Sequence, residues 1–258
     1  MRQWCIVIRS LRLAPNRAAE PALGGRQQMS KRDRLRGFLA CALLFLSLAA
    51  QACPVPSRQW QAEIDRLVAD DGEHPPPQDG VLFVGSSSIR MWTTLAADFP
   101  GVPVIDRGFG GSVIADTTYF ADRIVIPYHP RLIVMYAGDN DIAEGCSPRQ
   151  VLEEFEAFTA RVRRGLPDVA IAYISIKPSI ARFAMWPRMR EANRLIADWM
   201  RTQTRMSFVD VSPGMLGEHG TPRAALFRGD GLHMTAAGYA VWVQALEPVL
   251  ARYGFKLH

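Results

Sequence analysis

The sequence lacks the features that define several classes of protein. Its 258 residues contain no internal repeat, no long low-complexity stretch and no apolar run long enough to cross a bilayer. Hydrophobic residues make up 48% of the chain and charged residues 21%, which are the proportions of an ordinary globular protein. The composition therefore excludes a disordered chain, a collagen and a multi-span membrane protein.

Cysteine is scarce, with four residues in the whole chain, and two of them, Cys5 and Cys41, lie within the first 52 residues. The other two, Cys53 and Cys146, are too few for a disulfide framework. A bridge between them is compatible with an oxidising compartment. We nevertheless expect Cys53 to be free or to carry a lipid.

Signatures of metal and nucleotide sites are missing as well. Neither a G-x-G-x-x-G sequence nor a P-loop is present. The five histidines show no spacing typical of metal ligands. They are His74, His129, His219, His233 and His258. We therefore expect neither a metal nor a cofactor.

The positive charge of the chain is confined to its beginning. Residues 1–52 carry a formal charge of +7, whereas residues 53–258 carry −2. A nucleic-acid-binding protein needs a basic face on its folded domain. The charge distribution therefore argues against a nucleic-acid partner.

The first 52 residues are predicted to be a leader. From Met29 a basic stretch is followed by 13 uncharged, mostly apolar residues at 38–50, and Ala50-Gln51-Ala52 then precedes Cys53. This is the pattern of a secretory signal peptide, and 13 residues span only about 20 Å as a helix. Residues 1–28 are interpreted as a mis-started extension, and 53–258 as a single domain. Two alternatives stay open, a retained transmembrane anchor and a lipid on Cys53. For the processed domain, the lipid is the only membrane contact expected.

The remaining chain alternates between predicted strands and helices. Apolar runs typical of buried strands occur at 81–84, 102–105, 132–137, 169–176 and 207–211. Amphipathic stretches typical of helices occur at 59–69, 148–166, 191–204 and 236–253. This order predicts an α/β fold, a three-layer α/β/α sandwich around a mainly five-stranded parallel sheet. Ligands bind such sheets beyond the carboxyl ends of the strands.

Four short motifs follow the predicted strands or lie near the C-terminus. They are Gly85-Ser86-Ser87-Ser88, Gly108-Phe109-Gly110-Gly111, Gly138-Asp139-Asn140-Asp141 and Asp230-Gly231-Leu232-His233. Each motif alone is also compatible with a structural role. Serines often cap helices, and glycine-rich turns are often simple loop geometry.

Together and in this order, the four motifs resemble those of the SGNH (GDSL-type) hydrolase family, over residues 81–253. The resemblance implies a flavodoxin-like fold and makes Ser87 the nucleophile, with Gly111 and Asn140 in the oxyanion hole and Asp230 and His233 completing a triad. Ser86 stands where the family usually has Asp, and Asp106 where Asn is common. The first departure leaves the register open among the three serines 86–88.

The chemistry of ester hydrolysis needs these residue types. A serine hydroxyl is a weak nucleophile and requires a base within hydrogen-bonding reach, a role that His233 can fill with Asp230 fixing its tautomer. The backbone N–H groups of Ser87 and Gly111 and the amide of Asn140 are candidate donors to the oxyanion. An α/β-hydrolase elbow, Gly-x-Ser-x-Gly, is excluded because Ile89 stands two residues after Ser87.

The substrate is less well defined by the sequence. In the segment 177–187, Trp186 or Phe183 is a candidate for stacking on a sugar, and Lys177, Arg182 or Arg188 for binding an anionic group. The alternative is that the aromatic residues pack on the following helix and the charges are solvated.

No segment between the predicted elements is both long and apolar, which favours short acyl groups. We therefore expect an exported serine esterase, periplasmic, secreted or lipid-anchored, that cleaves acetyl esters of a polar or carbohydrate alcohol through an acyl-serine intermediate. The alternatives are a lipase or thioesterase for longer acyl chains and a catalytically inactive envelope protein that only binds.

Overall fold

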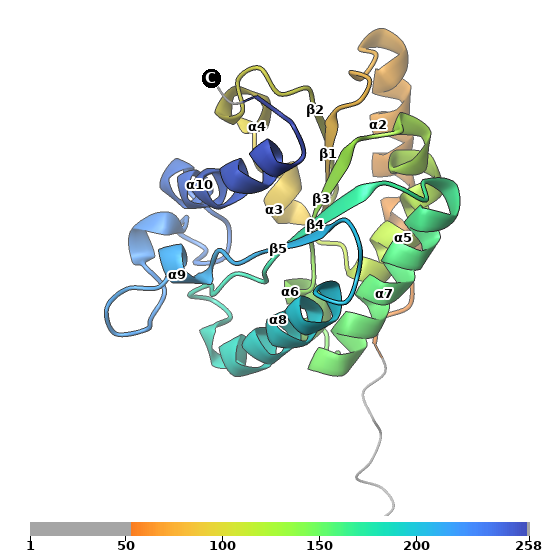
Figure 1. Ribbon diagram of the computed structural model, residues 1–258. Helices are drawn as coiled ribbons and strands as arrows, with labels where there is room; N and C mark the ends of the chain where they lie inside the picture. Colours follow the sequence, from red (N-terminus) through yellow and green to blue (C-terminus); the bar gives the residue numbers. More distant parts are fainter. Residues whose placement is uncertain (1–52, 257–258) are drawn as a thin grey trace, which may run out of the picture. The chain divides into compact units, whose positions relative to one another are not determined.

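The computed structural model describes residues 53–256, so the predicted leader at 1–52 lies outside the described residues. Within 53–256, none of the helices has the length and apolar character that a membrane span requires. The described residues form a central sheet with helices on both of its faces (Figure 1).

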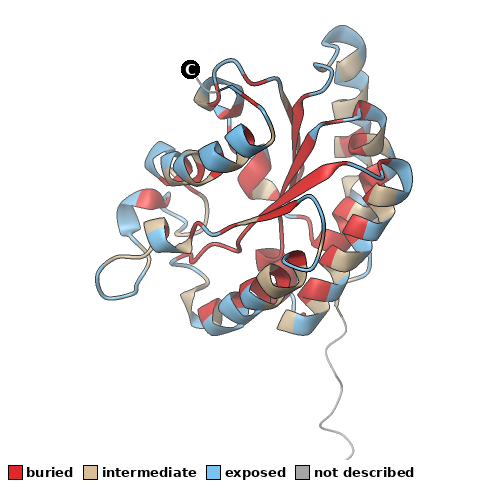
Figure 2. Ribbon diagram, viewed as in Figure 1, coloured by how far each residue is buried: buried red, intermediate tan, exposed pale blue. Residues whose placement is uncertain are grey.

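The sheet has five parallel strands in the order β2-β1-β3-β4-β5. Its strands are β1 Val81–Gly85, β2 Val104–Gly108, β3 Leu132–Tyr136, β4 Ala170–Ile174 and β5 Met206–Val209. Every residue of β1, β3 and β4 is buried (Figure 2). Burial on both faces explains why these segments are continuous apolar runs rather than alternating ones. The predicted three-layer fold is confirmed.

Helices on the two faces build two separate hydrophobic cores. One face carries α2 Gln61–Glu73, α5 Ile114–Ile124, α7 Pro148–Gly165 and α8 Trp186–Met200. The other face carries α3 Ser87–Arg90, α4 Leu95–Asp98, α9 Ser212–Met215 and α10 Ala236–Arg252. The sequence pattern did not predict α5, and α8 begins five residues before the predicted segment at 191. A further short helix, α6 Asp139–Ala143, follows β3 directly.

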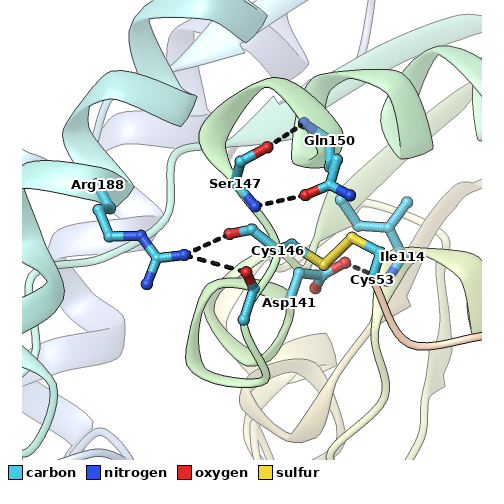
Figure 3. Close-up of a disulfide and its surroundings, with 8 residues drawn as sticks. Cys53, Ile114, Asp141, Cys146, Ser147, Gln150 and Arg188 are labelled. Atoms are coloured by element: carbon cyan, nitrogen blue, oxygen red, sulfur yellow. Dashed lines mark hydrogen bonds between the residues drawn. A yellow bond between two sulfur atoms is a disulfide. The ribbon is translucent and has the colours of Figure 1, made fainter. Parts of the chain in front are cut away.

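The structure corrects the prediction for Cys53. Its sulfur is bonded to that of Cys146, 93 residues further along the chain (Figure 3). Hydrogen bonds also fix the backbone of Cys146. The Cys146 N–H donates to the Asp141 carbonyl at 2.9 Å, and Arg188 donates to the Cys146 carbonyl at 2.7 Å. In this structure the sulfur of Cys53 is therefore bonded rather than free. Closing a loop of this length removes unfolded-state entropy equivalent to about 4–5 kcal/mol in the chain-entropy model.

Candidate active site

Ser87 is the first residue of α3, directly beyond the carboxyl end of β1. The turn before it requires a glycine, because Gly85 has φ 134° and a Cβ there would collide with the carbonyl oxygen of Tyr136 in β3. Two hydrogen bonds connect this turn to the ends of the neighbouring strands β3 and β2. The N–H of Ser86 donates to the Tyr136 carbonyl at 3.0 Å, and the N–H of Phe109 donates to the Gly85 carbonyl at 3.0 Å.

The structure distinguishes among the three consecutive serines. Only Ser87 reaches His233, with 3.0 Å between its Oγ and the histidine Nε2. Among residues 53–256 the buried Ser86 hydroxyl has no hydrogen-bond partner, and the Ser88 hydroxyl accepts a hydrogen bond from Lys177. The geometry therefore favours Ser87 as the reacting serine.

Asp230 orients His233 from the same tight turn. Its Oδ2 lies 2.6 Å from the histidine Nδ1, and its Oδ1 accepts the backbone N–H groups of Leu232 and His233 at 2.9 Å each. The hydrogen bond with His233, together with these two backbone donors, holds the pKa of Asp230 well below its usual range. An ionised carboxylate only accepts hydrogen bonds, so Nδ1 carries the proton and Nε2 is left to accept from Ser87.

Gly111 and Asn140 lie together at the same edge of the sheet. Asn140 is the second residue of α6, and its Nδ2 donates to the Ser112 carbonyl at 3.0 Å. A Cβ added to exposed Gly111 would meet only that Nδ2, at 3.8 Å, so the space beside the Gly111 backbone is open. Among residues 53–256, no hydrogen bond uses the N–H of Ser87 or of Gly111. Within the described residues, the backbone N–H groups of Ser87 and Gly111 and the second hydrogen of the Asn140 amide are thus without an acceptor.

The two residues that depart from the family pattern, Asp106 and Ser86, are both described by the structure. Asp106, in the middle of β2, accepts the N–H of Gly108 at 2.8 Å. Burial is the main cause that raises the pKa of Asp106 to about 6. Ser86 is 1% exposed. Neither side chain is hydrogen-bonded to Ser87 or His233.

Lys177 does not occupy the position that the sequence analysis assigned to it. Its side chain is fully buried, and its ammonium donates to Ser88 Oγ at 3.1 Å, the Tyr136 hydroxyl at 2.9 Å and Asp139 Oδ2 at 3.0 Å. Three N–H groups therefore meet three acceptors, and none is left for a substrate. The prediction that Lys177 contacts substrate is wrong.

The ionisation of this cluster follows from its burial and its charges. Burial raises the pKa of Asp139, but the nearby cations Lys177 and Arg182 outweigh it, and the pKa lies below its usual range. Burial lowers the pKa of Lys177, and Asp139 opposes this. The carboxylate of Asp139 is therefore ionised, and it accepts a further hydrogen bond from the Tyr136 hydroxyl at 3.1 Å.

Trp186 is also placed differently from the prediction. It is the first residue of α8, is 8% exposed and belongs to the hydrophobic core on that face of the sheet. Phe183, in the short helix Phe183–Met185, packs against the same core. The aromatic part of the alternative agrees with this core position, whereas its solvated charges do not, because Lys177 is fully buried and Arg182 is largely shielded. Trp186 presents little surface for stacking on a sugar.

Sequence reasoning missed the polar cluster beneath the site. Ser88, Tyr136 and Asp139 join Lys177 there, and Arg182 donates to Asn140 from the same side. One signal was present in the sequence, a lysine placed directly after an apolar strand. Its three partners come from other segments, and no local pattern identifies them.

The comparisons with known proteins agree with this geometry. The family model of the GDSL-like Lipase/Acylhydrolase family matches residues 58–241. No curated protein matches the chain.

Similar solved structures share the fold at low sequence identity. A Streptococcus pneumonia protein assigned as a platelet activating factor is 19% identical, with a TM-score of 0.65, and the match covers 83% of this chain and 99% of that one. A GDSL-like lipase from Bacteroides thetaiotaomicron is 21% identical, with a TM-score of 0.63 and coverage of 74% and 98%. A variant of an acetyl-xylooligosaccharide esterase from Geobacillus stearothermophilus is 16% identical, with a TM-score of 0.55 and coverage of 70% and 96%.

The position of Asn140 leads to a prediction for its side chain. Removal of one oxyanion donor typically costs roughly 2.7–4 kcal/mol of transition-state stabilisation. Asn140→Ala should therefore lower kcat for p-nitrophenyl acetate about a hundredfold or more and change KM much less. Gln59→Ala, which removes an exposed amide in the short helix Arg58–Trp60, serves as the control. A folded Asn140→Ala protein with near-normal kcat would contradict the assignment.

Proposed function

The chain belongs to the GDSL-like lipase/acylhydrolase family and is a serine ester hydrolase, and we propose that Ser87 is its nucleophile. The observation that carries this proposal is the continuous hydrogen-bonded chain from Ser87 through His233 to Asp230. A serine, a base and a carboxylate in this order are the arrangement that activates a hydroxyl for attack on an acyl carbon.

The proposed reaction proceeds in two halves. His233 accepts the Ser87 proton through Nε2 as Oγ attacks the ester carbonyl, and the same nitrogen then donates that proton to the departing alcohol. This leaves an acyl group on Ser87. A water molecule activated by His233 then releases the acid and restores the serine. Asp230 stays ionised throughout and stabilises the imidazolium.

The negative charge that develops on the carbonyl oxygen is met by donors already in place. The N–H groups of Ser87 and Gly111 and the amide of Asn140 come from the ends of β1, β2 and β3. Because a hydrogen-bonded sheet positions all three, little reorganisation is needed when the charge appears.

Covalent labelling tests the nucleophile. A fluorophosphonate should modify Ser87, and mass spectrometry of the digested protein locates the adduct. Ser87→Ala should abolish labelling and nearly all turnover, whereas Ser57→Ala, which removes a hydroxyl from a half-buried position outside the site, should label normally.

An adduct on either neighbouring serine would overturn this assignment. If the wild-type protein were not labelled at all, the alternative of a binding protein that uses the fold without catalysis would be favoured.

We further propose that the acyl group is short, with acetyl preferred, and that the alcohol is polar, such as a carbohydrate. Among the described residues, only Val55, Tyr119 and Ile180 are large hydrophobic side chains with substantial exposure. Ile180 alone of these lies against Gly231, in the turn that carries His233. A long acyl chain needs many buried methylenes, each worth about 0.8 kcal/mol. The acetyl-xylooligosaccharide esterase among the similar structures has a substrate of the proposed kind.

Acyl-chain length provides the test. The value of kcat/KM on p-nitrophenyl esters should be highest for acetate and decline steadily beyond butyrate. Rates with Ser87→Ala supply the correction for spontaneous hydrolysis of each ester. A maximum at octanoate or longer would favour the lipase or thioesterase alternative.

We also propose that the protein is exported, as a soluble periplasmic or secreted form. The signal-like segment at 29–52 supports this, and so does the bond between Cys53 and Cys146, because disulfides persist in oxidising compartments. The sulfur of Cys53 is used by this bond, which disfavours a lipid anchor.

Expression of the full chain in a bacterium tests export. The envelope fraction should contain a protein that begins at Cys53 and has no thiol reactive to alkylation until it is reduced. Cys146→Ser should expose one such thiol on Cys53. A cytosolic protein with its leader intact would contradict export, and a diacylglyceryl adduct on Cys53 would show a lipoprotein instead.

A further inference from the structure

Arg182 contacts the oxyanion donor directly. Its Nη1 donates to Asn140 Oδ1 at 2.9 Å and lies 3.4 Å from Asp139 Oδ2. The arginine side chain is 19% exposed and Asn140 is 8% exposed, so this contact is largely shielded from water. Hydrogen bonds that involve a charged group are stronger than neutral ones, and shielding from solvent strengthens them further.

The amide of Asn140 is thereby fixed from both ends. Its Nδ2 donates one hydrogen to the Ser112 carbonyl at 3.0 Å, and its Oδ1 accepts from Arg182. An amide turned by 180° would place its oxygen against a carbonyl and its NH₂ against a cation. The observed orientation leaves the second hydrogen of Nδ2 for another acceptor on the side of Gly111.

We propose that Arg182 is a positioning residue, which holds and polarises the Asn140 amide so that its remaining N–H meets the oxyanion. This inference rests on the proposed esterase function. Withdrawal of electron density from Oδ1 makes the Nδ2 hydrogens better donors, and restriction of the amide removes a reorganisation step from the reaction.

The loop that carries Arg182 is anchored on both sides of the site. At its start, buried Lys177 binds the Asp139 carboxylate that also faces Arg182. In its middle, the N–H of Ala181 donates to the carbonyl of Gly231 at 3.0 Å, in the turn of Asp230 and His233. The loop that carries the guanidinium is therefore fixed by contacts to both halves of the candidate active site.

The first measurement separates positioning from substrate binding. Arg182→Ala should lower kcat for p-nitrophenyl acetate about tenfold to a hundredfold while KM changes less than about threefold, because a neutral acetate ester offers the guanidinium no anionic group. Arg182→Lys, which keeps the charge without the planar fork, should retain an intermediate kcat. A change in KM alone would overturn the positioning role.

A double-mutant cycle gives the readout that a merely structural role would not produce. If Arg182 acts through Asn140, then Arg182→Ala introduced into Asn140→Ala should lower kcat by less than about threefold further. Guanidinium chloride at millimolar concentration should partly restore kcat of Arg182→Ala and leave Asn140→Ala unchanged. Additive losses in the cycle, or no rescue by guanidinium, would contradict the proposal.

Arg194→Ala is the matched control. Arg194 lies in the following helix α8, is exposed, and pairs with Glu191 and Asp198 but contacts neither Asn140 nor Asp139. Its kcat should stay within about threefold of wild type, and a loss as large as that of Arg182→Ala would overturn the specific role. Circular dichroism establishes folding of each variant. If Arg182→Ala does not fold, Arg182→Lys replaces it in the double-mutant cycle with Asn140→Ala.

The outcomes separate this inference from the proposed function. An active wild-type enzyme with an additive cycle would refute the role of Arg182 alone. A folded wild-type protein without esterase activity would refute both.

Discussion

The ammonium group of Lys177 joins the strand ends from which the candidate active site is built. Lys177 itself follows β4, and it donates to Ser88 beyond β1, to Tyr136 at the end of β3 and to Asp139 at the start of α6. A fully buried charge is tolerated only because each of its N–H groups has an acceptor and one of these is a carboxylate. Removal of one partner of such a buried pair typically costs about 3–5 kcal/mol.

This buried cluster connects the segment of the proposed nucleophile with the segment of a proposed oxyanion donor. Ser88 is adjacent to Ser87, and Asp139 is adjacent to Asn140, so the backbone segments of the nucleophile and of one oxyanion donor meet the same cation. Arg182 adds a second cation that faces both Asp139 and Asn140. The proposed nucleophile and oxyanion donor are thus each adjacent in sequence to a residue of this buried, charged cluster. Preorganisation of this kind is what makes hydrogen bonds to a developing oxyanion effective.

The disulfide extends this support toward the start of the described chain. Cys53 is tied to Cys146, which follows α6, and the N–H of Cys146 donates to Asp141 in that helix (Figure 3). Asp141 in turn accepts the N–H of Ile114 at the start of α5. The segments that carry Asn140 and Gly111 are therefore connected by a hydrogen bond between α6 and α5, and the disulfide ties the start of the described chain to the end of the Asn140 segment.

The sequence by itself determined the layer architecture, the parallel sheet and the motif residues, because buried strands need continuous apolar runs and the reacting groups occur in short local patterns. Ser87, Asn140, Asp230 and His233 were predicted from the resemblance of these motifs to those of a known family. Only the tertiary structure decided that Lys177 supports the site from below, that Trp186 is in the core and that Arg182 faces Asn140. Lys177 and Ser88 are 89 residues apart and Cys53 and Cys146 are 93 apart. Contacts between such distant segments depend on how strands and loops pack, and a buried lysine and an exposed one look the same in sequence.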